Sequence, residues 1–253
     1  MTRFMQVWIL ALALAMTAAT AMAETVIGKN VDSRVILAFK VSDDGASAML
    51  PEGWRALTLP KGPMAGANML VAFIDRHLAL DPEGKPLDPH ASRSLALVAF
   101  GVSPEVEGPR MFVTRVYETP PVADSYGNGA AAAISRETAL SGPADGARVQ
   151  RDMWVVAPET GGEIRLELSY AAGRPHWGHD EARPYSAAKP EFHRIYRYDQ
   201  LADLAMSTAL GKALDGEISF SSSVPGLDSV FDGREVLTAV LVVPVYVREA
   251  SLP

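Results

Sequence analysis

The sequence has 253 residues, no cysteine and a formal net charge of −7. The lack of cysteine excludes disulfides, thiolate metal sites and cysteine nucleophiles. The excess of acidic residues, with no cluster of Lys and Arg, argues against nucleic acid or an anionic membrane as the main partner, because both attract basic patches.

The first 23 residues are predicted to be a secretory signal peptide. They hold one basic residue, Arg3, then an apolar run from Phe4 to Ala19, then Ala21-Met22-Ala23 in front of Glu24. A membrane anchor is the alternative, but the run is shorter than the roughly 20 residues that a span needs. Cleavage leaves residues 24–253 as one domain of charge −8. We therefore predict a periplasmic or secreted protein with no stable membrane insertion after cleavage.

The mature chain is predicted to consist mainly of β-strands. The clearest is Glu163–Tyr170, in which apolar and polar residues alternate strictly, as in a strand with one buried face. Pro244 cannot donate to a ladder, so its strand should bulge or lie at an edge there. The expected strands are Arg34–Val41, Asn68–Ile74, Leu95–Val102, Arg110–Glu118, Ala131–Glu137, Ala147–Val156, Glu163–Tyr170, Phe192–Tyr198, Gly216–Ser223 and Glu235–Arg248.

One helix and three long connections complete the predicted elements. Leu201–Leu210 is expected to be helical, with Asp199 as its N-cap and Gly211 after its last turn. The connections are Asp75–Ser94, Thr119–Gly129 and Ala171–Pro190, and the last is expected to form an ordered lid. The fold class is therefore mainly β, an antiparallel β-barrel or strongly curled sheet with one short α-helix, so that few strand edges are exposed.

The order of these signals resembles the acetoacetate decarboxylase-like superfamily. The likeness rests on Leu50-Pro-Glu-Gly-Trp54 and the strand after it, on Ser135-Arg136-Glu137 followed by Gly142-Pro143, and on the serine-rich strand at Ser221–Ser223 with the long final strand. The resemblance implies a β-barrel around a small apolar cavity, which active members use for Schiff-base chemistry on oxo-acids.

The sequence departs from this family where its catalytic lysine is expected. In active members one or two lysines follow the proline, whereas Ala144 and Asp145 follow Pro143 here. A carbinolamine requires an amine, which neither residue supplies. The nearest lysines in sequence are Lys85 and Lys189, and the resemblance covers neither. We therefore expect Schiff-base catalysis to be absent or altered.

Arg136 and Glu137 are the first candidates for ligand binding. Neighbouring residues of a strand point to opposite faces, so one of the two can enter the barrel. An inward Arg136 could bind a carboxylate with two parallel hydrogen bonds, and Tyr117 and Trp154 would supply an apolar wall. The alternative is a surface arginine that pairs with a neighbouring strand.

A group of histidines is the second candidate. His176, His179 and His193 lie within eighteen residues. Two histidines, or a histidine and Asp180, could bind a divalent ion with His193 completing the set, because imidazole and carboxylate are the available ligands where cysteine is absent. The alternative is a solvated or hydrogen-bonded loop.

Two functional hypotheses therefore stay open. The first is an exported protein without a cofactor that binds a small organic acid or oxo compound in the barrel. The second is a lyase or hydrolase that uses a divalent metal at the histidines. The chain has no G-x-S-x-G, Walker or Rossmann motif, so hydrolases with a nucleophile elbow and nucleotide enzymes lose support. If the protein is an enzyme, we expect a decarboxylase-like lyase or a metal-dependent hydrolase.

Overall fold

The computed structural model describes residues 24–120, 124–144 and 146–253. The predicted signal peptide, residues 1–23, lies outside this part. Within the described residues the chain forms thirteen strands and one helix. In order they are β1 (Thr25–Lys40), α1 (Asp43–Ala48), β2 (Arg55–Ala56), β3 (Met69–Leu80), β4 (Ser92–Ser103), β5 (Val106–Thr119), β6 (Gly129–Ser141), β7 (Arg148–Pro158), β8 (Ile164–Ala172), β9 (His176–Ala182), β10 (Pro184–Ser186), β11 (Ile195–Ser207), β12 (Gly216–Ser222) and β13 (Val236–Leu252).

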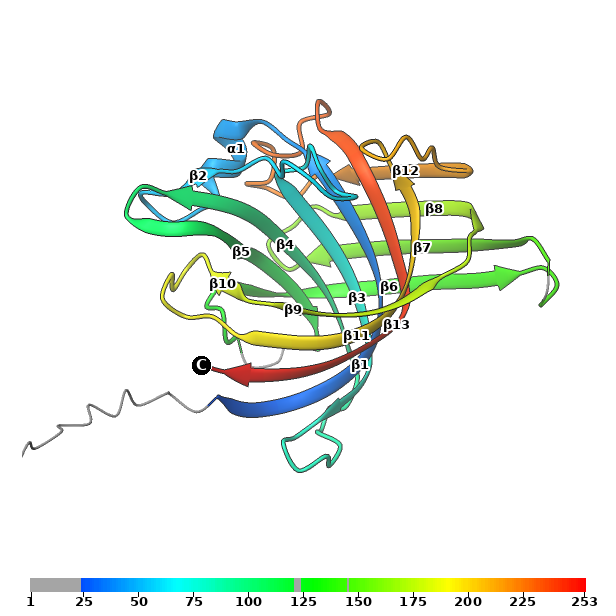
Figure 1. Cartoon of the computed structure of the whole chain (residues 1–253), viewed down its shortest axis with the longest axis horizontal. Helices are drawn as coiled ribbons and strands as arrows, with labels where there is room; N and C mark the ends of the chain where they lie inside the picture. The colour runs from blue at the N-terminus through cyan, green and yellow to red at the C-terminus, as the bar shows by residue number, and fades with distance from the viewer. Residues whose placement is uncertain (1–23, 121–123, 145) are drawn as a thin grey trace, which may run out of the picture.

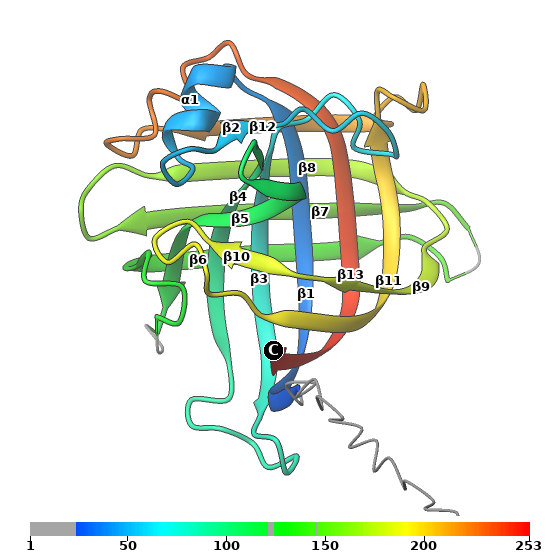
Figure 2. The same cartoon turned by 60° about the vertical axis from the view of Figure 1, so that its left-hand side comes forward.

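All strands belong to one strongly curled sheet. Its order is β12-β8-β7-β6-β5-β4-β3-β1-β13-β11-β9, with β10 paired to β5 and β2 paired to β4. The sheet folds back on itself, so that β6, β7, β8 and β12 run across the long strands β1, β3 and β13 (Figure 1, Figure 2). The prediction of a mainly β, curled sheet with one short helix is confirmed.

The main hydrophobic core fills the space between the two halves of the folded sheet. Alternate residues of β1, such as Val35 and Leu37, point into it and meet Trp154 of β7 and Leu166 of β8. Because side chains alternate along a strand, the residues between them, including Arg34, lie on the opposite face of β1.

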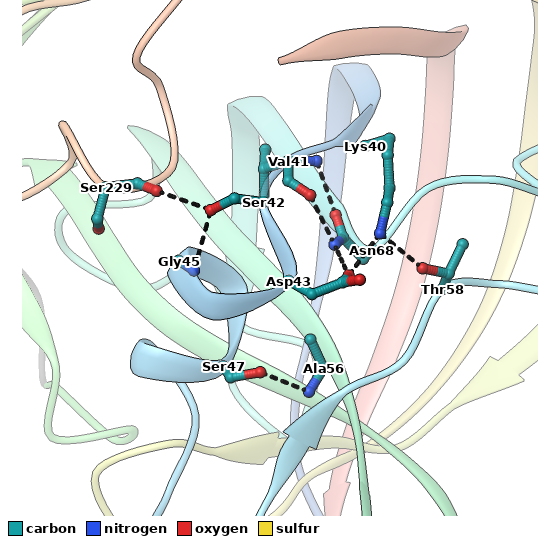
Figure 3. A network of polar contacts seen from close by, with 10 residues as sticks. All are labelled: Lys40, Val41, Ser42, Asp43, Gly45, Ser47, Ala56, Thr58, Asn68 and Ser229. Atoms are coloured by element: carbon teal, nitrogen blue, oxygen red, sulfur yellow. Dashed lines mark hydrogen bonds and ion pairs between the residues drawn. The ribbon is translucent and has the colours of Figure 1, made fainter. Parts of the chain in front are cut away.

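The helix α1 follows β1 directly and lies at one end of the molecule (Figure 1). Ser42 is its N-cap: the hydroxyl accepts a hydrogen bond from Gly45 N at 3.0 Å. Asp43 accepts hydrogen bonds from Asn68 and Lys40, and Asn68 also binds both backbone polar groups of Val41 (Figure 3). These contacts tie the helix to the start of β3.

The helix predicted at Leu201–Leu210 is wrong, because most of this segment belongs to β11. Asp199, the expected N-cap, lies within the strand between His179 of β9 and Val247 of β13. The register of β11 on β13 shifts between Leu201 and Asp203 and again between Leu204 and Met206. The buried positions here are Asp203, Ala205 and Ser207, while Leu201, Leu204 and Met206 are only partly buried, so the large apolar residues do not mark the buried face of the strand.

Several expected connections contain strands. Ala171–Pro190 holds the end of β8, β9 and β10, while Asp75–Leu80 continues β3 and Ser92–Ser94 begins β4. Phe192–Tyr198 becomes regular strand only from Ile195. The connection Thr119–Gly129 includes residues 121–123, which lie outside the described part.

Two features of the predicted sheet need correction. Three residue pairs of β5 and β6 are parallel, as is the pairing of β10 with β5, so the sheet is mixed rather than antiparallel. The path from β12 to β9 does not close into a barrel. The predicted bulge at Pro244 is confirmed, because the pairing of β1 with β13 shifts between Tyr246 and Val243. No helix among the described residues is long and apolar enough to cross a membrane.

Candidate functional site

Arg136 lies on the core side of β6, with its side chain only 6% exposed. Its Nε donates to Asp152 Oδ1 at 2.8 Å, and its Nη1 donates to Ser33 Oγ at 2.6 Å and to Asp75 Oδ2 at 3.3 Å. The guanidinium also lies over the Trp154 ring, 4.9 Å from its centroid. Arg136 therefore points inward, where two carboxylates and a hydroxyl already bind it.

The other predicted ligand-binding residues lie in different surroundings. Trp154 is fully buried and packs on Phe73, and its Nε1 has no hydrogen-bond partner among the described residues. Tyr117 belongs to the same core, and burial raises the pKa of its hydroxyl. Glu137 points the other way, into an open hollow of about 550 Å³ on the outer side of β6, β7, β8 and β12.

The three predicted metal ligands are not brought together. His176 and His179 are exposed on β9, and an odd spacing places them on opposite faces of that strand. His193 precedes β11 and stacks on Tyr185 at 4.5 Å. Burial, followed by the charges of Arg183 and Arg110, lowers the pKa of His193. The described part of the chain contains no group of three histidine or carboxylate residues that could hold an ion.

The lysines of the chain all lie in the described part, and none is buried. Lys85 and Lys189 are exposed in connections. Ala144, at the position where the resembled family has lysine, is exposed in the turn between β6 and β7, and Asp145 lies outside the described residues. No lysine therefore has the burial that lowers the pKa of catalytic amines in other proteins.

An arginine cluster lies on the face of β1, β3 and β13 that points away from the main core. The arginine cluster consists of Arg34, Arg76 and Arg248 together with the carboxylates of Asp32 and Glu118. Arg34 binds Asp32 with two hydrogen bonds of 2.7 and 3.0 Å, although its side chain is only 10% exposed. Arg76 Nη1 lies 3.6 Å from Glu118 Oε1.

Aromatic rings surround this cluster. The guanidinium of Arg34 lies 3.4 Å from the centroid of the Tyr246 ring, and that of Arg248 lies 4.0 Å from the Tyr196 ring. Tyr196, together with Phe192 and Tyr126, packs on this side of β4 and β5. The cluster is thus enclosed on one side by aromatic side chains.

The cluster holds more positive than negative charge. Arg248 donates from Nε to Asn30 Oδ1 at 2.8 Å and forms no ion pair among the described residues. Arg76 Nε is buried and has no hydrogen-bond partner among the described residues. Burial, followed by the charge of Arg248, lowers the pKa of the Arg76 guanidinium. Such a site can bind an anion, because a fork of guanidinium donors matches a carboxylate.

Sequence reasoning missed this cluster for an identifiable reason. Asn30, Asp32 and Arg34 alternate with apolar or small residues, but the predicted strand begins only at Arg34. Tyr246 and Arg248 show the same spacing at the end of β13. Polar residues with a period of two inside otherwise apolar strands were the available signal.

A surface hollow of about 680 Å³ runs along β9, β11 and β13. Its lining is mainly the face of these strands that carries the ion pairs Lys29–Glu249 and Arg197–Glu181. Arg248 borders this hollow, but alternation places its side chain on the other face of the sheet, with Tyr196 and Asn30.

No family model and no curated protein sequence matches the chain. Solved structures do match over nearly its whole length. The enduracididine biosynthesis enzyme MppR with HEPES buffer bound has a TM-score of 0.60 at 12% identity, with 95% of this chain and 91% of that chain covered. MppR complexed with pyruvate has a TM-score of 0.55 at 12% identity, covering 95% and 93%.

A third solved structure that matches the chain is described by its family. An acetoacetate decarboxylase-like enzyme from Sphingomonas wittichii RW1 has a TM-score of 0.55 at 13% identity, covering 90% of this chain and 91% of that chain. At such low identity the likeness concerns the fold alone. The chain has an acetoacetate decarboxylase-like fold.

Proposed function

We propose that this chain is an exported protein that binds a small organic acid or oxo compound at the arginine cluster, without Schiff-base catalysis. The observation that carries the proposal is the excess of three arginines over two carboxylates on a partly enclosed face. A buried charge is costly unless it is paired, so a bound anion would stabilise this arrangement.

The shape and composition of the cluster favour a small carboxylate. Arg248 presents guanidinium donors beside aromatic rings, a combination of a few polar groups and apolar walls that is typical of ligand sites. One protein of similar fold is described as complexed with pyruvate, a small oxo acid. This comparison supports the ligand class.

Arg136, the anchor predicted from the sequence, remains the alternative position for the acid. Its donors are bound to Asp152, Asp75 and Ser33, so a ligand would have to displace one of them. We therefore place the anchor at Arg248. Nothing in the structure favours the metal-dependent alternative, since the described histidines do not converge.

Ligand-dependent melting tests this assignment. Mature protein is melted with and without pyruvate or acetoacetate, and each variant is compared with its own ligand-free form. A ligand at 100 times its Kd stabilises the folded state by roughly 2.7 kcal/mol, which raises the melting temperature by several degrees. We expect Arg248→Met to abolish this shift.

The matched control is Arg197→Met, which borders the same hollow but pairs with Glu24 and Glu181. It should keep the shift. Loss of the shift in Arg136→Met but not in Arg248→Met would move the anchor to the position predicted from the sequence. The absence of any shift with the native chain would refute the proposed ligand class.

Export is tested separately by the intact mass of protein taken from its native compartment. We expect a chain that begins at Glu24. A mass that retains Met1–Ala23 would contradict the proposed export and leave the ligand proposal to its own test.

A further inference from the structure

Two tyrosines form a hydrogen-bonded pair beside the arginine cluster. The hydroxyls of Tyr126, before β6, and Tyr196, on β11, lie 2.7 Å apart. Tyr126 is only 8% exposed, and the buried hydroxyl of Ser186 donates to its backbone carbonyl. Tyr196 is partly exposed. The pair is therefore held in place from the side of Tyr126, and Tyr196 is its less buried residue.

Two guanidinium groups flank the pair. Arg248 lies 4.0 Å from the centroid of the Tyr196 ring, and Arg194 lies 5.8 Å from that of Tyr126. Arg194 donates to Ser125, and its Nε is buried without a hydrogen-bond partner among the described residues. A negative charge on a phenolic oxygen between these arginines would be stabilised.

The two hydroxyls differ in acidity. Burial raises the pKa of Tyr126, and its neighbour Tyr196 raises it further. Burial acts in the same direction on Tyr196, but the charges of Arg248 and Arg194 and the hydrogen bond from Tyr126 outweigh it and lower its pKa. Tyr196 is thus the more acidic hydroxyl of the pair, and once it is ionised Tyr126 is the donor.

The remaining charged and titratable groups near Tyr196 are Arg34 and Tyr246. The pKa of Arg34 is raised, because Asp32 and Tyr246 outweigh the effect of burial. Burial raises the pKa of Tyr246. Arg34 therefore stays charged and Tyr246 stays protonated, which leaves Tyr196 as the group of this set that can accept a proton.

We propose that Tyr196 is a general base that removes a proton from the carbon next to the carbonyl of a 2-oxo acid. The inference rests on the proposed function, because the arginine cluster must hold the carboxylate. The C–H electron pair becomes the C=C bond of the enolate, and the carbonyl π pair moves to oxygen beside Arg248. The proton resides on Tyr196 and returns to carbon when the ketone reforms, so no oxidant is required.

Tyr126 is a positioning residue in this scheme. Its hydroxyl donates to the phenolate of Tyr196 and lowers the proton affinity of that oxygen. Without it, Tyr196 should ionise only at higher pH. This effect separates a role in catalysis from a role in packing, because a merely structural contact would not move the pH profile.

Hydrogen exchange into pyruvate tests the proposal. The mature protein is incubated with pyruvate in D2O, and loss of the methyl proton signal is followed by NMR. We expect exchange above the buffer rate, a loss of about 100-fold or more in Tyr196→Phe, and a profile shifted to higher pH in Tyr126→Phe. Tyr185→Phe is the control, since the Tyr185 ring contacts Phe112 and His193 rather than Tyr126 or the arginine cluster.

The outcomes distinguish this inference from the proposed function. A pyruvate-dependent melting shift without exchange, or exchange that Tyr196→Phe leaves unchanged, overturns the inference alone. The absence of both shift and exchange overturns the ligand class and the inference together. An ultraviolet pH titration provides a readout without ligand: the native chain should contain a tyrosine that ionises below the usual value of about 10, and Tyr196→Phe should lack it.

Discussion

Arg136 shows how much of a site can be derived from one residue. The alternation of β6 predicted that either Arg136 or Glu137 would point inward, and the structure places Arg136 on the core side. Its partners could not be predicted, because Ser33 and Asp75 lie 103 and 61 residues away in the sequence. Long-range pairing of strands determines that part of the site.

Removing the Arg136 guanidinium should destabilise the fold strongly. In Arg136→Met the carboxylate of Asp152, which is fully buried, loses its charged partner and keeps only Gln150. An unpaired buried charge costs roughly 3–5 kcal/mol. Chemical denaturation of the mature chain measures this loss in the free energy of unfolding.

Arg165→Met is the control for this prediction, because Arg165 forms an exposed ion pair with Glu163 and should change stability little. The double variant Arg136→Met with Asp152→Leu should recover part of the loss, since it removes both charges. An Arg136→Met variant as stable as the native chain would show that the buried pair contributes nothing.

His193 should make stability depend on pH. Its folded pKa lies below its ordinary value because of burial, followed by Arg183 and Arg110, so the folded state binds this proton less tightly than the unfolded state. This contribution to stability is complete above the unfolded pKa of about 6.5 and is lost as the pH falls below it.

The melting temperature should therefore fall more between pH 7 and pH 5 in the native chain than in His193→Phe, which retains an aromatic ring against Tyr185. His179→Phe, at an exposed position, should follow the native chain. Equal slopes in the native chain and His193→Phe would contradict the assigned cause.

At the scale of elements, α1 contains a glycine, Gly45, at which helix propensity predicts the wrong sign for the effect of an alanine substitution on stability. Alanine is favoured over glycine by about 1 kcal/mol in a helix interior. At Gly45, however, a Cβ would lie 2.0 Å from the carbonyl oxygen of Ser229, which is backbone and cannot swing away. The close approach of the segment around Ser229 therefore requires glycine.

Gly45→Ala should thus destabilise the protein by about 1–3 kcal/mol, the usual cost of overpacking. Thermal melting checks the direction of the change. Asp44→Ala, at an exposed position of the same helix, should cost less than about 1 kcal/mol. If Gly45→Ala raises the melting temperature, propensity dominates and the packing of α1 against the segment around Ser229 is loose.

Elements with regular alternation were predictable from the sequence, and irregular ones were not. Glu163–Tyr170 corresponds to β8 within one or two residues at either end. Polar and small residues at the buried positions of β11 hid one strand, and the polar, proline-rich sequence around β9 and β10 hid two more. The six residues of α1 are too few for a periodic pattern, although Ser42 and the acidic first turn were signals for its start.

At the scale of the whole molecule, the curl of the sheet separates two polar clusters. Ser33, Asp75, Arg136 and Asp152 lie on the core side of the sheet, while Arg34 and Arg248 lie on the opposite face. In the first set two carboxylates bind one inward arginine. In the second set arginines outnumber carboxylates. This difference in charge balance is why we propose that an anionic ligand binds on the face opposite the core.

The exposure of the lysines over the whole molecule argues against Schiff-base chemistry. Such chemistry needs an amine with a lowered pKa, which proteins create by burial or by a neighbouring cation. No lysine of this chain is buried. Lys29 and Lys40, moreover, form ion pairs with Glu249 and Asp43.

Borohydride treatment in the presence of pyruvate or acetoacetate should therefore leave the mass of the mature chain unchanged. Intact-mass spectrometry measures this directly, and an aldolase that forms a known Schiff base serves as the positive control for trapping. A stoichiometric adduct, located by peptide mapping on Lys85 or Lys189, would contradict the prediction. Binding at the arginine cluster would then have to be reconsidered as part of an amine-dependent reaction, because an iminium ion needs its carboxylate held in the same way.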